Sequence, residues 1–345
     1  MTNLLVTGGS GFFGEALSRK LLDQDHNVTI FDLNKPGFDH KNLTFIQGDI
    51  RNYEQINNAC KNIDIIHHNV AQVPIAKDNA LFWSVNYEGS KNILEAALEN
   101  NVPKVVYTSS SAVYGVPENN PVTEQTSASP QEEYGKAKYA AEELCHEYKE
   151  KGLNISIVRP RTILGHGRLG IFQILFEWIY QGYNIPVLGS GDNIYQFIHS
   201  SDMADACIAA GFYQENTDFN IGAKEFSSMR DTLENLTKHA GTGSKVKSVP
   251  MGLTIAGMKV TSLLGLSPLG GYHSLMYGRS MYFDISKAEK LLGFKPQYSS
   301  YKMFQETYDW YVENREAILA GKYSTGSKHQ SALKQKCLSI IKYII

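Results

Sequence analysis

The sequence predicts an α/β fold in which a doubly wound parallel sheet carries helices on both faces. Short β-branched runs alternate with longer helical patterns through the first half of the chain, and this alternation is typical of βαβ units. A glycine-rich segment, residues 7–14, joins the first of these runs to the first helical pattern. The 345 residues, 42% of them hydrophobic and 20% charged, are enough to bury a large core.

Strands and helices are expected to alternate up to Pro160, except that the third strand follows the second without a helix between them. Strands are predicted at residues 4–7, 28–31, 43–46, 63–67, 104–108 and 154–158, and helices at 14–22, 53–60, 82–99 and 133–150. Glycine-rich loops then flank a helix at 171–181, and further sheet segments are predicted at 196–199 and 218–221. Residues 226–266 are expected to be mostly helical.

Charge and cysteine content exclude several classes of protein. The net charge of −2 supplies no basic field for nucleic acid, so no nucleic-acid partner is expected. The four cysteines are far apart and form no CxxC pair, which predicts neither a zinc site nor a disulfide framework. No metal is expected, and reduced thiols favour a cytoplasmic location. No apolar run reaches about 18 residues, so no spanning helix is expected.

The glycine-rich segment predicts a dinucleotide site. Its sequence is Thr-Gly-Gly-Ser-Gly-Phe-Phe-Gly, ending at Gly14, and it lies between a strand and a helix. Glycines let the backbone approach a pyrophosphate, and the helix N-terminus offers free N–H groups to it. Asp32 follows eighteen residues after Gly14, at the end of the second strand. A carboxylate there binds the adenosine ribose and repels a 2′-phosphate, so the predicted cofactor is NAD and the fold is Rossmann-like.

A second pattern predicts acid–base chemistry on an alcohol or ketone. Tyr134 and Lys138 are four residues apart and so share one face of the helix expected there. A nearby ammonium favours the phenolate, so Lys138 is expected to lower the pKa of Tyr134 toward the working range. A serine from the run Ser109–Ser111, at the end of the fifth strand, can hold the substrate oxygen.

Together these residues resemble the extended short-chain dehydrogenase/reductase superfamily, in its NAD-dependent epimerase/dehydratase branch. The resemblance runs over residues 3–313 and depends on an ordered set of motifs. They are the glycine segment, Gly48-Asp49, Asn86, residues 109–115, Tyr134-x-x-x-Lys138, Arg159-Pro160, Phe197-Ile-His199, Asn220-Ile-Gly222 and Asp284-Ile-Ser-Lys-Ala288. The resemblance implies about seven strands, with NAD at the switch point between strands one and four.

The resemblance also assigns roles to residues. Ser110, Tyr134 and Lys138 would be catalytic, with Ser109 and Ser111 as neighbouring candidates for the serine. Asn86 would support the active-site helix, Asp49 and Ile50 would flank the adenine, and residues 69–71 would line the cofactor cleft. The implied cofactor-binding set is Gly8, Gly11, Phe12, Phe13, Gly14, Asp32, Asp49, Ile50, Asn69, Val70, Ala71, Asn86, Thr108, Tyr134, Lys138 and Pro160.

Departures from the family pattern bear on the substrate. Ser111-Ala112 replace the Asp-Glu pair of the 4,6-dehydratases and disfavour that reaction. Tyr195 stands where sugar-nucleotide epimerases commonly have an arginine, and Thr162 where they have an asparagine. The candidate substrate residues are Ser111, Thr162, Arg168, Tyr195 and Gln196, and Arg161 and Arg279 are further candidates for binding phosphate.

Three functions stay open at this point. The favoured one is a nucleotide-sugar epimerase or reductase, because that role is the commonest in the branch. The apolar segment 251–266, with Tyr282-Phe-Asp284, looks more like the 3β-hydroxysteroid-dehydrogenase branch, whose substrates are hydrophobic alcohols. The third is a non-catalytic NAD-sensing module, which the intact Ser110, Tyr134 and Lys138 disfavour.

The chain is expected to divide into two domains and a tail. Residues 1–160 with 197–222 would bind NAD, and residues 161–196 with 223–317 would bind a small-molecule substrate. Residues 318–345 would form a basic amphipathic tail, with apolar residues at helical spacing and nearby lysines. Docking on its own enzyme or a partner subunit, or fraying, is slightly favoured for such a tail, and weak, reversible contact with a membrane surface is the most that we expect otherwise. A homodimer is left open.

Overall fold

A parallel sheet of seven strands forms the centre of the molecule. The computed structural model describes residues 1–73, 78–250, 252, 276 and 278–321. The strands lie in the order β10-β6-β5-β4-β1-β2-β3, and every neighbouring pair is parallel. Their bounds are β1 Asn3–Thr7, β2 Asn27–Asp32, β3 Leu43–Gln47, β4 Ile65–His68, β5 Lys104–Thr108, β6 Ile155–Pro160 and β10 Thr217–Ile221. The predicted Rossmann-like sheet, including its strand count, is confirmed.

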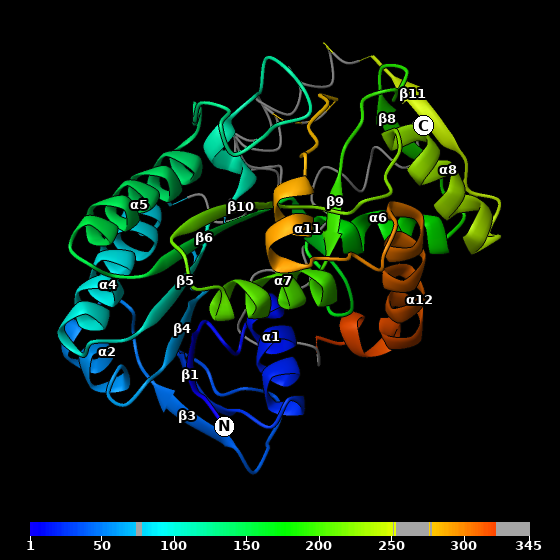
Figure 1. Cartoon of the computed structure of the whole chain (residues 1–345). Coiled ribbons are helices and arrows are strands. Elements are labelled where there is room, and N and C mark those ends of the chain that lie inside the picture. The colour runs from blue at the N-terminus through cyan, green and yellow to red at the C-terminus, as the bar shows by residue number, and fades with distance from the viewer. Residues whose placement is uncertain (74–77, 251, 253–275, 277, 322–345) are drawn as a thin grey trace.

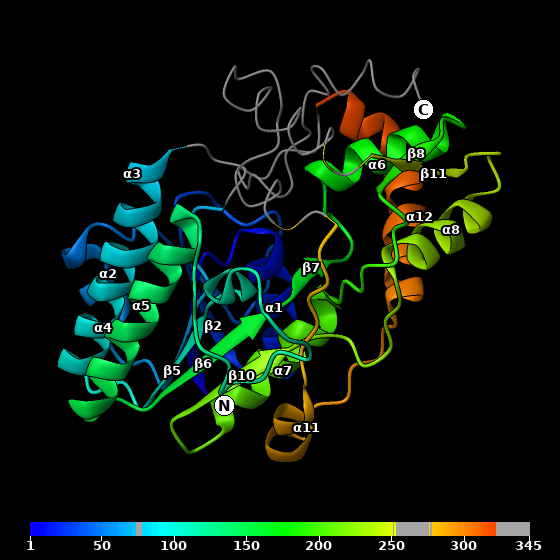
Figure 2. The ribbon, with the colours of Figure 1, turned by 90° about the horizontal axis from the view of Figure 1, so that it is seen from above.

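Helices cover both faces of this sheet, as Figures 1 and 2 show. One face carries α2 (Tyr53–Ala59), α4 (Gly89–Glu99) and α5 (Glu133–Glu150). The other face carries α1 (Phe12–Asp23), α7 (Ser200–Phe212) and α11 (Ser286–Leu292). The order of β1 between β4 and β2 places a topological switch point at the carboxyl end of β1, where dinucleotides bind in folds of this kind.

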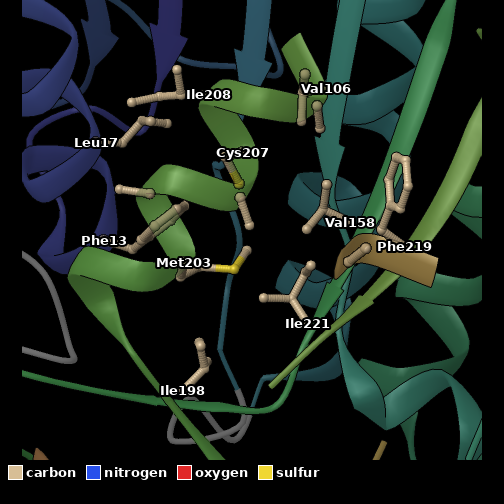
Figure 3. Close-up of a cluster of buried hydrophobic side chains, with 14 of the residues drawn as sticks. Phe13, Leu17, Val106, Val158, Ile198, Met203, Cys207, Ile208, Phe219 and Ile221 are labelled. Carbon is tan, nitrogen blue, oxygen red and sulfur yellow. The ribbon is translucent and has the colours of Figure 1, made fainter. Parts of the chain in front are cut away.

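Strand side chains alternate between two apolar cores because successive residues of a strand point to opposite faces. In β1, Leu4 and Val6 pack toward α1 and α7, whereas Leu5 packs toward α2 and α4. In β6, Val158 joins the first core and Ile157 the second. Figure 3 shows the first core, in which Val106, Val158, Phe219 and Ile221 of the strands meet Phe13 and Leu17 of α1 and Met203, Cys207 and Ile208 of α7.

A second, smaller part of the molecule lies beside the sheet and has its own core. Its helices are α6 (Ile171–Tyr180), α8 (Met229–Ala240) and α12 (Ser300–Leu319), and two strands, β8 (Ile185–Leu188) and β11 (Val246–Val249), pair in parallel. Figure 2 shows these elements gathered on the side of the sheet that carries α1 and α7. Phe176, Phe304, Tyr308 and Tyr311 fill the core between α6 and α12.

Two short strands connect this part to the sheet. β7 (Thr162–Leu164) follows β6 after one residue, and it pairs in parallel with β9 (Phe197–His199), which leads into α7. Residues 161–170 therefore leave the carboxyl edge of the sheet and enter the smaller part directly. This position brings Arg161 and Arg168 close to the end of β6.

Some sequence predictions were wrong in detail. Residues 226–266 were expected to be mostly helical, but β11 is a strand whose pairing with β8, about 60 residues away, no local pattern shows. The helix predicted at 82–99 is interrupted, since Phe82–Glu88 (η1) is a π-helix that precedes α4 and follows the single turn α3 (Asn79–Leu81). β7 and β8 were not predicted at all.

Other expectations fall outside the described residues. They are the apolar segment 253–266 and most of the tail, residues 322–345. Within the described part of the chain, no helix is both long and apolar enough to cross a membrane.

Candidate active site

The glycine segment forms a tight turn that only glycine permits. Gly8 has a φ of 71°, in the left-handed region that other residues avoid. A side chain at Gly14 would place its Cβ 2.0 Å from the carbonyl oxygen of Gly8, so α1 begins in direct contact with the turn. No side chain caps the N-terminus of α1, and the N-terminus of a helix offers N–H groups and a positive dipole end to an anion. The turn therefore fits a pyrophosphate.

Asp32 closes this turn at the end of β2. One carboxylate oxygen accepts a hydrogen bond from the Ser10 N–H at 3.1 Å and the other from the Asn34 N–H at 3.0 Å. Burial raises the pKa of Asp32, and these backbone hydrogen bonds partly offset that rise. The carboxylate is thus fixed beside the glycine turn, as a ribose-binding acid would have to be.

Asp49 and Ile50 lie one strand further along, after β3. The Arg51 guanidinium holds both oxygens of Asp49, and this hydrogen bonding lowers the pKa of Asp49. The Ile50 side chain is buried, while its carbonyl accepts a hydrogen bond from Asn92 of α4. The Asp49 N–H also donates to the Gln55 side chain at 2.9 Å, and the predicted contact of Asp49 and Ile50 with adenine stays a prediction.

Hydrogen bonds tie together the ends of the three central strands. The Thr108 hydroxyl of β5 donates to the Asn69 side-chain oxygen at 2.6 Å, and the Asn69 N–H reaches the Thr7 hydroxyl of β1 at 3.2 Å. His68 of β4 joins that Thr7 hydroxyl to the Ser90 hydroxyl of α4. Burial lowers the pKa of His68 to about 3, so the ring is neutral. The predicted cleft residues 69–71 thus lie on a rigid edge.

Asn86 lies in the π-helix and holds the chain that follows this edge. Its amide accepts from the Gln72 N–H at 2.7 Å and donates to the Gln72 carbonyl at 3.0 Å, which is the pairing pattern of a neighbouring strand. The described residues therefore give Asn86 a supporting role beside the cleft. Its predicted contact with the cofactor stays a prediction.

Tyr134 and Ser110 are brought together where α5 begins. The Ser110 side chain lies close enough to the Tyr134 hydroxyl to lower its pKa. A Cβ on Gly135 would lie 2.6 Å from the Ala112 carbonyl oxygen, so the glycine lets α5 touch the 3-10 turn η2 (Ser111–Tyr114) that follows Ser110. Glu132 caps the helix by accepting the N–H groups of Tyr134 and Gly135. Of the three serines, Ser110 is the one that meets Tyr134.

Lys138 lies one turn further along α5 and is completely enclosed. Its ammonium nitrogen donates to the Thr108 carbonyl oxygen at 2.7 Å and lies 4.3 Å from the centre of the Tyr107 ring. Burial lowers the pKa of Lys138 to about 7. The ammonium group of Lys138, which extends from α5, is therefore fixed against the end of β5.

The expected direction of the Tyr134 pKa is reversed in the structure. Burial raises it to about 12, although the Ser110 hydrogen bond and the charge of Arg168 each act to lower it. The sequence argument counted the attraction of a neighbouring cation and left out the cost of enclosing the phenolate. A positive charge in the cleft is therefore needed before Tyr134 ionises easily.

The remaining candidate substrate residues occupy two settings. Ser111 accepts a hydrogen bond from the Arg161 guanidinium at 2.8 Å, and the Thr162 and Tyr195 hydroxyls are 3.0 Å apart. The Arg161 guanidinium lies 4.5 Å from the centre of the Tyr195 ring. Arg161, the single residue between β6 and β7, thus packs against the residue that replaces the epimerase arginine.

Gln196 has a different environment. Its amide nitrogen donates to the Ala223 carbonyl and its oxygen accepts from the Phe283 N–H. A Cβ on Gly222 would overlap the amide. The geometry gives Gln196 a role in joining β9 to the residues after β10, and its contact with substrate stays a prediction.

A buried ion network beside the site was missed by the sequence reasoning. Arg159 of β6 donates to both oxygens of Glu142 on α5, at 2.9 and 2.7 Å, and to Asp218 of β10 at 3.0 Å. It also reaches the Tyr114 hydroxyl of η2 at 3.2 Å. The sequence did contain one indication that Glu142 belongs to the site. Tyr134, Lys138 and Glu142 are each four residues apart, so they share one face of the helix.

This network connects the two segments that supply the candidate catalytic groups. Burial alone would lower the pKa of Arg159, but the Glu142 carboxylate raises it well above its usual value. Arg159 therefore stays charged and joins the helix of Tyr134 to the turn after Ser110.

The chain has relatives whose sequences match most of its length. The family model described as "NAD dependent epimerase/dehydratase family" matches residues 4–222. The chain belongs to the NAD-dependent epimerase/dehydratase family. It is an enzyme family, and NAD is its cofactor. The resemblance stated from the motifs is confirmed.

Individual relatives differ in the reactions that their names describe. The chain is 53% identical to the uncharacterized protein y4nG of Sinorhizobium fredii, over 99% of this chain and 86% of that protein. It is 27% identical to a putative UDP-glucose 4-epimerase of Methanocaldococcus jannaschii, over 90% of this chain and 99% of that protein. It is 25% identical to the decarboxylating sterol-4-alpha-carboxylate 3-dehydrogenase of Mus musculus, over 84% of this chain and 86% of that protein.

Solved structures share the fold. A UDP-glucose 4-epimerase of Thermotoga maritima, determined with UDP-glucose, matches with a TM-score of 0.77 at 23% identity, over 91% of this chain and 99% of that one. This match extends the fold similarity beyond residue 222, into the smaller part of the molecule.

Removing Arg159 should destabilise the protein strongly. Arg159→Met leaves the Glu142 carboxylate, whose side chain is 1% exposed, without its partner. Breaking such a buried pair costs about 3–5 kcal/mol of unfolding free energy, measurable by urea titration. The control Arg19→Met breaks an exposed pair with Glu15 and should cost about 0.5 kcal/mol. Equal losses in both variants would contradict the importance of the network.

Proposed function

We propose that this enzyme transfers a hydride between NAD and a secondary alcohol or ketone, with Ser110, Tyr134 and Lys138 as its catalytic residues. The observation that carries the proposal is the close packing of the start of α5, with Tyr134, on the turn that follows Ser110, with Lys138 enclosed one turn away at the end of β5. The glycine turn and Asp32 lie at the carboxyl ends of β1 and β2, on the same edge of the sheet. A dinucleotide bound along that edge would extend toward Tyr134.

The chain's own residues would handle the proton and the oxygen. Ser110 would hold the substrate oxygen, and Tyr134 would take its proton during oxidation or return it during reduction. Lys138, fixed by the Thr108 carbonyl, would stabilise the phenolate and also bind the nicotinamide ribose. NAD, when bound, supplies the hydride acceptor, and its oxidised ring adds the positive charge that favours ionised Tyr134. Enclosure of both groups excludes water from the proton transfer.

The cofactor contacts are proposed on the same basis. The glycine turn and the N-terminus of α1 would hold the pyrophosphate, and Asp32 the adenosine ribose. The backbone at Asp49 and Ile50 would flank the adenine. Asn69–Ala71, Thr108 and Pro160 would line the cleft between them. We also propose that residues 161–196 and 223–317, which include the core of α6, α8 and α12, form the substrate-binding side.

A nucleotide sugar is the substrate class that we propose. Named relatives and fold neighbours include UDP-glucose 4-epimerases, and the match to one of them covers 90% of this chain. Arg161 lies against Tyr195, so a guanidinium is present next to the position where epimerases carry theirs. The second candidate is a hydrophobic alcohol, which the similarity to a sterol dehydrogenase favours.

Removal of the Tyr134 hydroxyl should abolish most activity while leaving the cofactor bound. Tyr134→Phe keeps the ring that packs on Phe82 but loses the proton-transferring group. Turnover should fall by about 10²–10⁴-fold, with NADH affinity near that of the wild type. Steady-state kinetics and NADH fluorescence measure the two quantities. Turnover within threefold of the wild type would exclude Tyr134 as the acid–base group.

Asp32 should determine the preference for NAD over NADP. In the wild type the fixed carboxylate repels a 2′-phosphate, so NADP should bind at least tenfold more weakly than NAD. Asp32→Asn should narrow that difference because it removes the charge and keeps the shape. Titration of both cofactors into both proteins measures this. Stronger binding of NADP than of NAD by the wild type would show that the role of Asp32 is wrong.

A substrate panel tests the proposed class. UDP- and TDP-sugars should be epimerised, reduced or oxidised, whereas hydroxysteroids should not react. Product analysis by chromatography and mass spectrometry distinguishes an epimerase, which returns the hydride, from a dehydrogenase or reductase. Oxidation of the hydroxysteroids alone would replace the nucleotide sugar with the hydrophobic alcohol.

A further inference from the structure

Arg168 is a buried cation that the described residues leave uncompensated. It lies in the loop between β7 and α6, and its side chain is enclosed except for about a twelfth of its surface, 8%. Its Nε atom is buried without a hydrogen-bond partner. In the described part of the chain, no carboxylate lies within 4 Å of its guanidinium. Transfer of an unpaired charge from water into such a place is costly, so a compensating group is expected.

Aromatic rings, and not acids, hold this guanidinium in place. Its carbon lies 5.7 Å from the centre of the Phe12 ring and 5.5 Å from that of the Phe172 ring. Contacts of this kind fix the orientation of a guanidinium but return only a part of the lost hydration. Burial lowers the pKa of Arg168 to about 9, which agrees with the lack of a carboxylate partner.

The contrast with Arg159 shows what is missing. Arg159 is buried to a similar degree, and it makes hydrogen bonds to two carboxylates and a phenol. Arg168 is equally enclosed, but its guanidinium is surrounded by aromatic rings. The parallel N–H groups of this guanidinium make no hydrogen bond to the described residues. A planar fork of this kind matches a carboxylate or a phosphate with two hydrogen bonds.

The position of Arg168 limits where that group can be. Phe12 is the first residue of α1, directly after the glycine turn. On the other side, the charge of Arg168 acts on Tyr134. The guanidinium is therefore near the proposed pyrophosphate site, and its charge acts on the proposed proton-transferring hydroxyl.

We infer that Arg168 binds an oxyanion of a ligand in the cleft, near the glycine turn and Tyr134. Two sources have this chemistry. One is the pyrophosphate of the cofactor, and the other is an acidic group of the substrate, either its diphosphate or a carboxylate on the sugar. The substrate source rests on the proposed nucleotide-sugar function, whereas the cofactor source requires only that NAD binds.

The test replaces Arg168 and measures three affinities without turnover. Arg168→Gln keeps a polar side chain of similar reach and removes the charge, and Arg168→Lys keeps the charge without the fork. Binding of NADH is measured by fluorescence, and binding of UDP-glucose and UDP-glucuronic acid by calorimetry in the presence of NAD. Arg19→Gln, which removes an exposed arginine two turns along α1, is the matched control.

We expect Arg168→Gln to weaken at least one of these affinities tenfold or more and Arg168→Lys to recover part of the loss. A loss for NADH identifies the pyrophosphate. Losses for both UDP-sugars identify the substrate diphosphate, and a loss for UDP-glucuronic acid alone identifies a carboxylate.

The stability of the unliganded protein separates binding from a structural role. Because the buried charge lacks a carboxylate, Arg168→Gln should melt at the same temperature as the wild type or higher. Affinities within twofold of the wild type for every ligand that the wild type binds would overturn the inference. Failure of the wild type to bind either UDP-sugar would count against the nucleotide-sugar proposal alone, and the NADH measurement would then decide the role of Arg168.

Discussion

Cations enclosed at the carboxyl edge of the parallel sheet are the constraint on which the site depends. Lys138, Arg159, Arg161 and Arg168 are all buried there, and each must recover the hydration that folding removed. Arg159 does so with Glu142 and Asp218. Lys138 has a backbone carbonyl, Arg161 a serine hydroxyl and a thioether sulfur, and Arg168 aromatic rings. Of these four cations, only Arg159 forms an ion pair with carboxylates of the described residues.

Arg159, the cation that is paired with carboxylates, makes the site rigid. The other three cations, Lys138, Arg161 and Arg168, contribute to its chemistry. Through Glu142 and Tyr114, Arg159 fixes the distance between the helix of Tyr134 and the turn after Ser110. Gly135 allows those two segments to touch. With the frame held in this way, the enclosed Tyr134 and Lys138 can have shifted pKa values without displacement of the backbone. Shifts of this kind are typical of functional sites.

Features encoded by neighbouring residues could be predicted from the sequence. The glycine turn, Asp32, and the pair Tyr134 and Lys138 each have a short, fixed spacing, and the structure places them on one edge of the sheet. The strands of the sheet also followed from alternation of short runs and helices. The choice of Ser110 came from the family resemblance, and the position of its side chain near the Tyr134 hydroxyl agrees with that choice.

Features that join distant segments could not be predicted. Asp218 meets Arg159 across 59 residues, and β11 meets β8 across about as many, so neither leaves a local signal. The predicted direction of the Tyr134 pKa was wrong for a related reason, because the enclosure of Tyr134 depends on packing from η1 and η2, which are distant in sequence. Gln196 was predicted from its place beside Tyr195, although both ends of its amide are engaged by Ala223 and Phe283.

The most direct test of the account follows the hydride itself. The reactive substrate would be prepared with deuterium on the carbinol carbon, mixed with the NAD-bound enzyme for less than one turnover, and quenched in acid. The account predicts that the NADH formed is one mass unit heavier than ordinary NADH, with the deuterium at C4 of the nicotinamide. Turnover in which the deuterium is lost to water and the cofactor stays unlabelled would contradict hydride transfer as the function of this site.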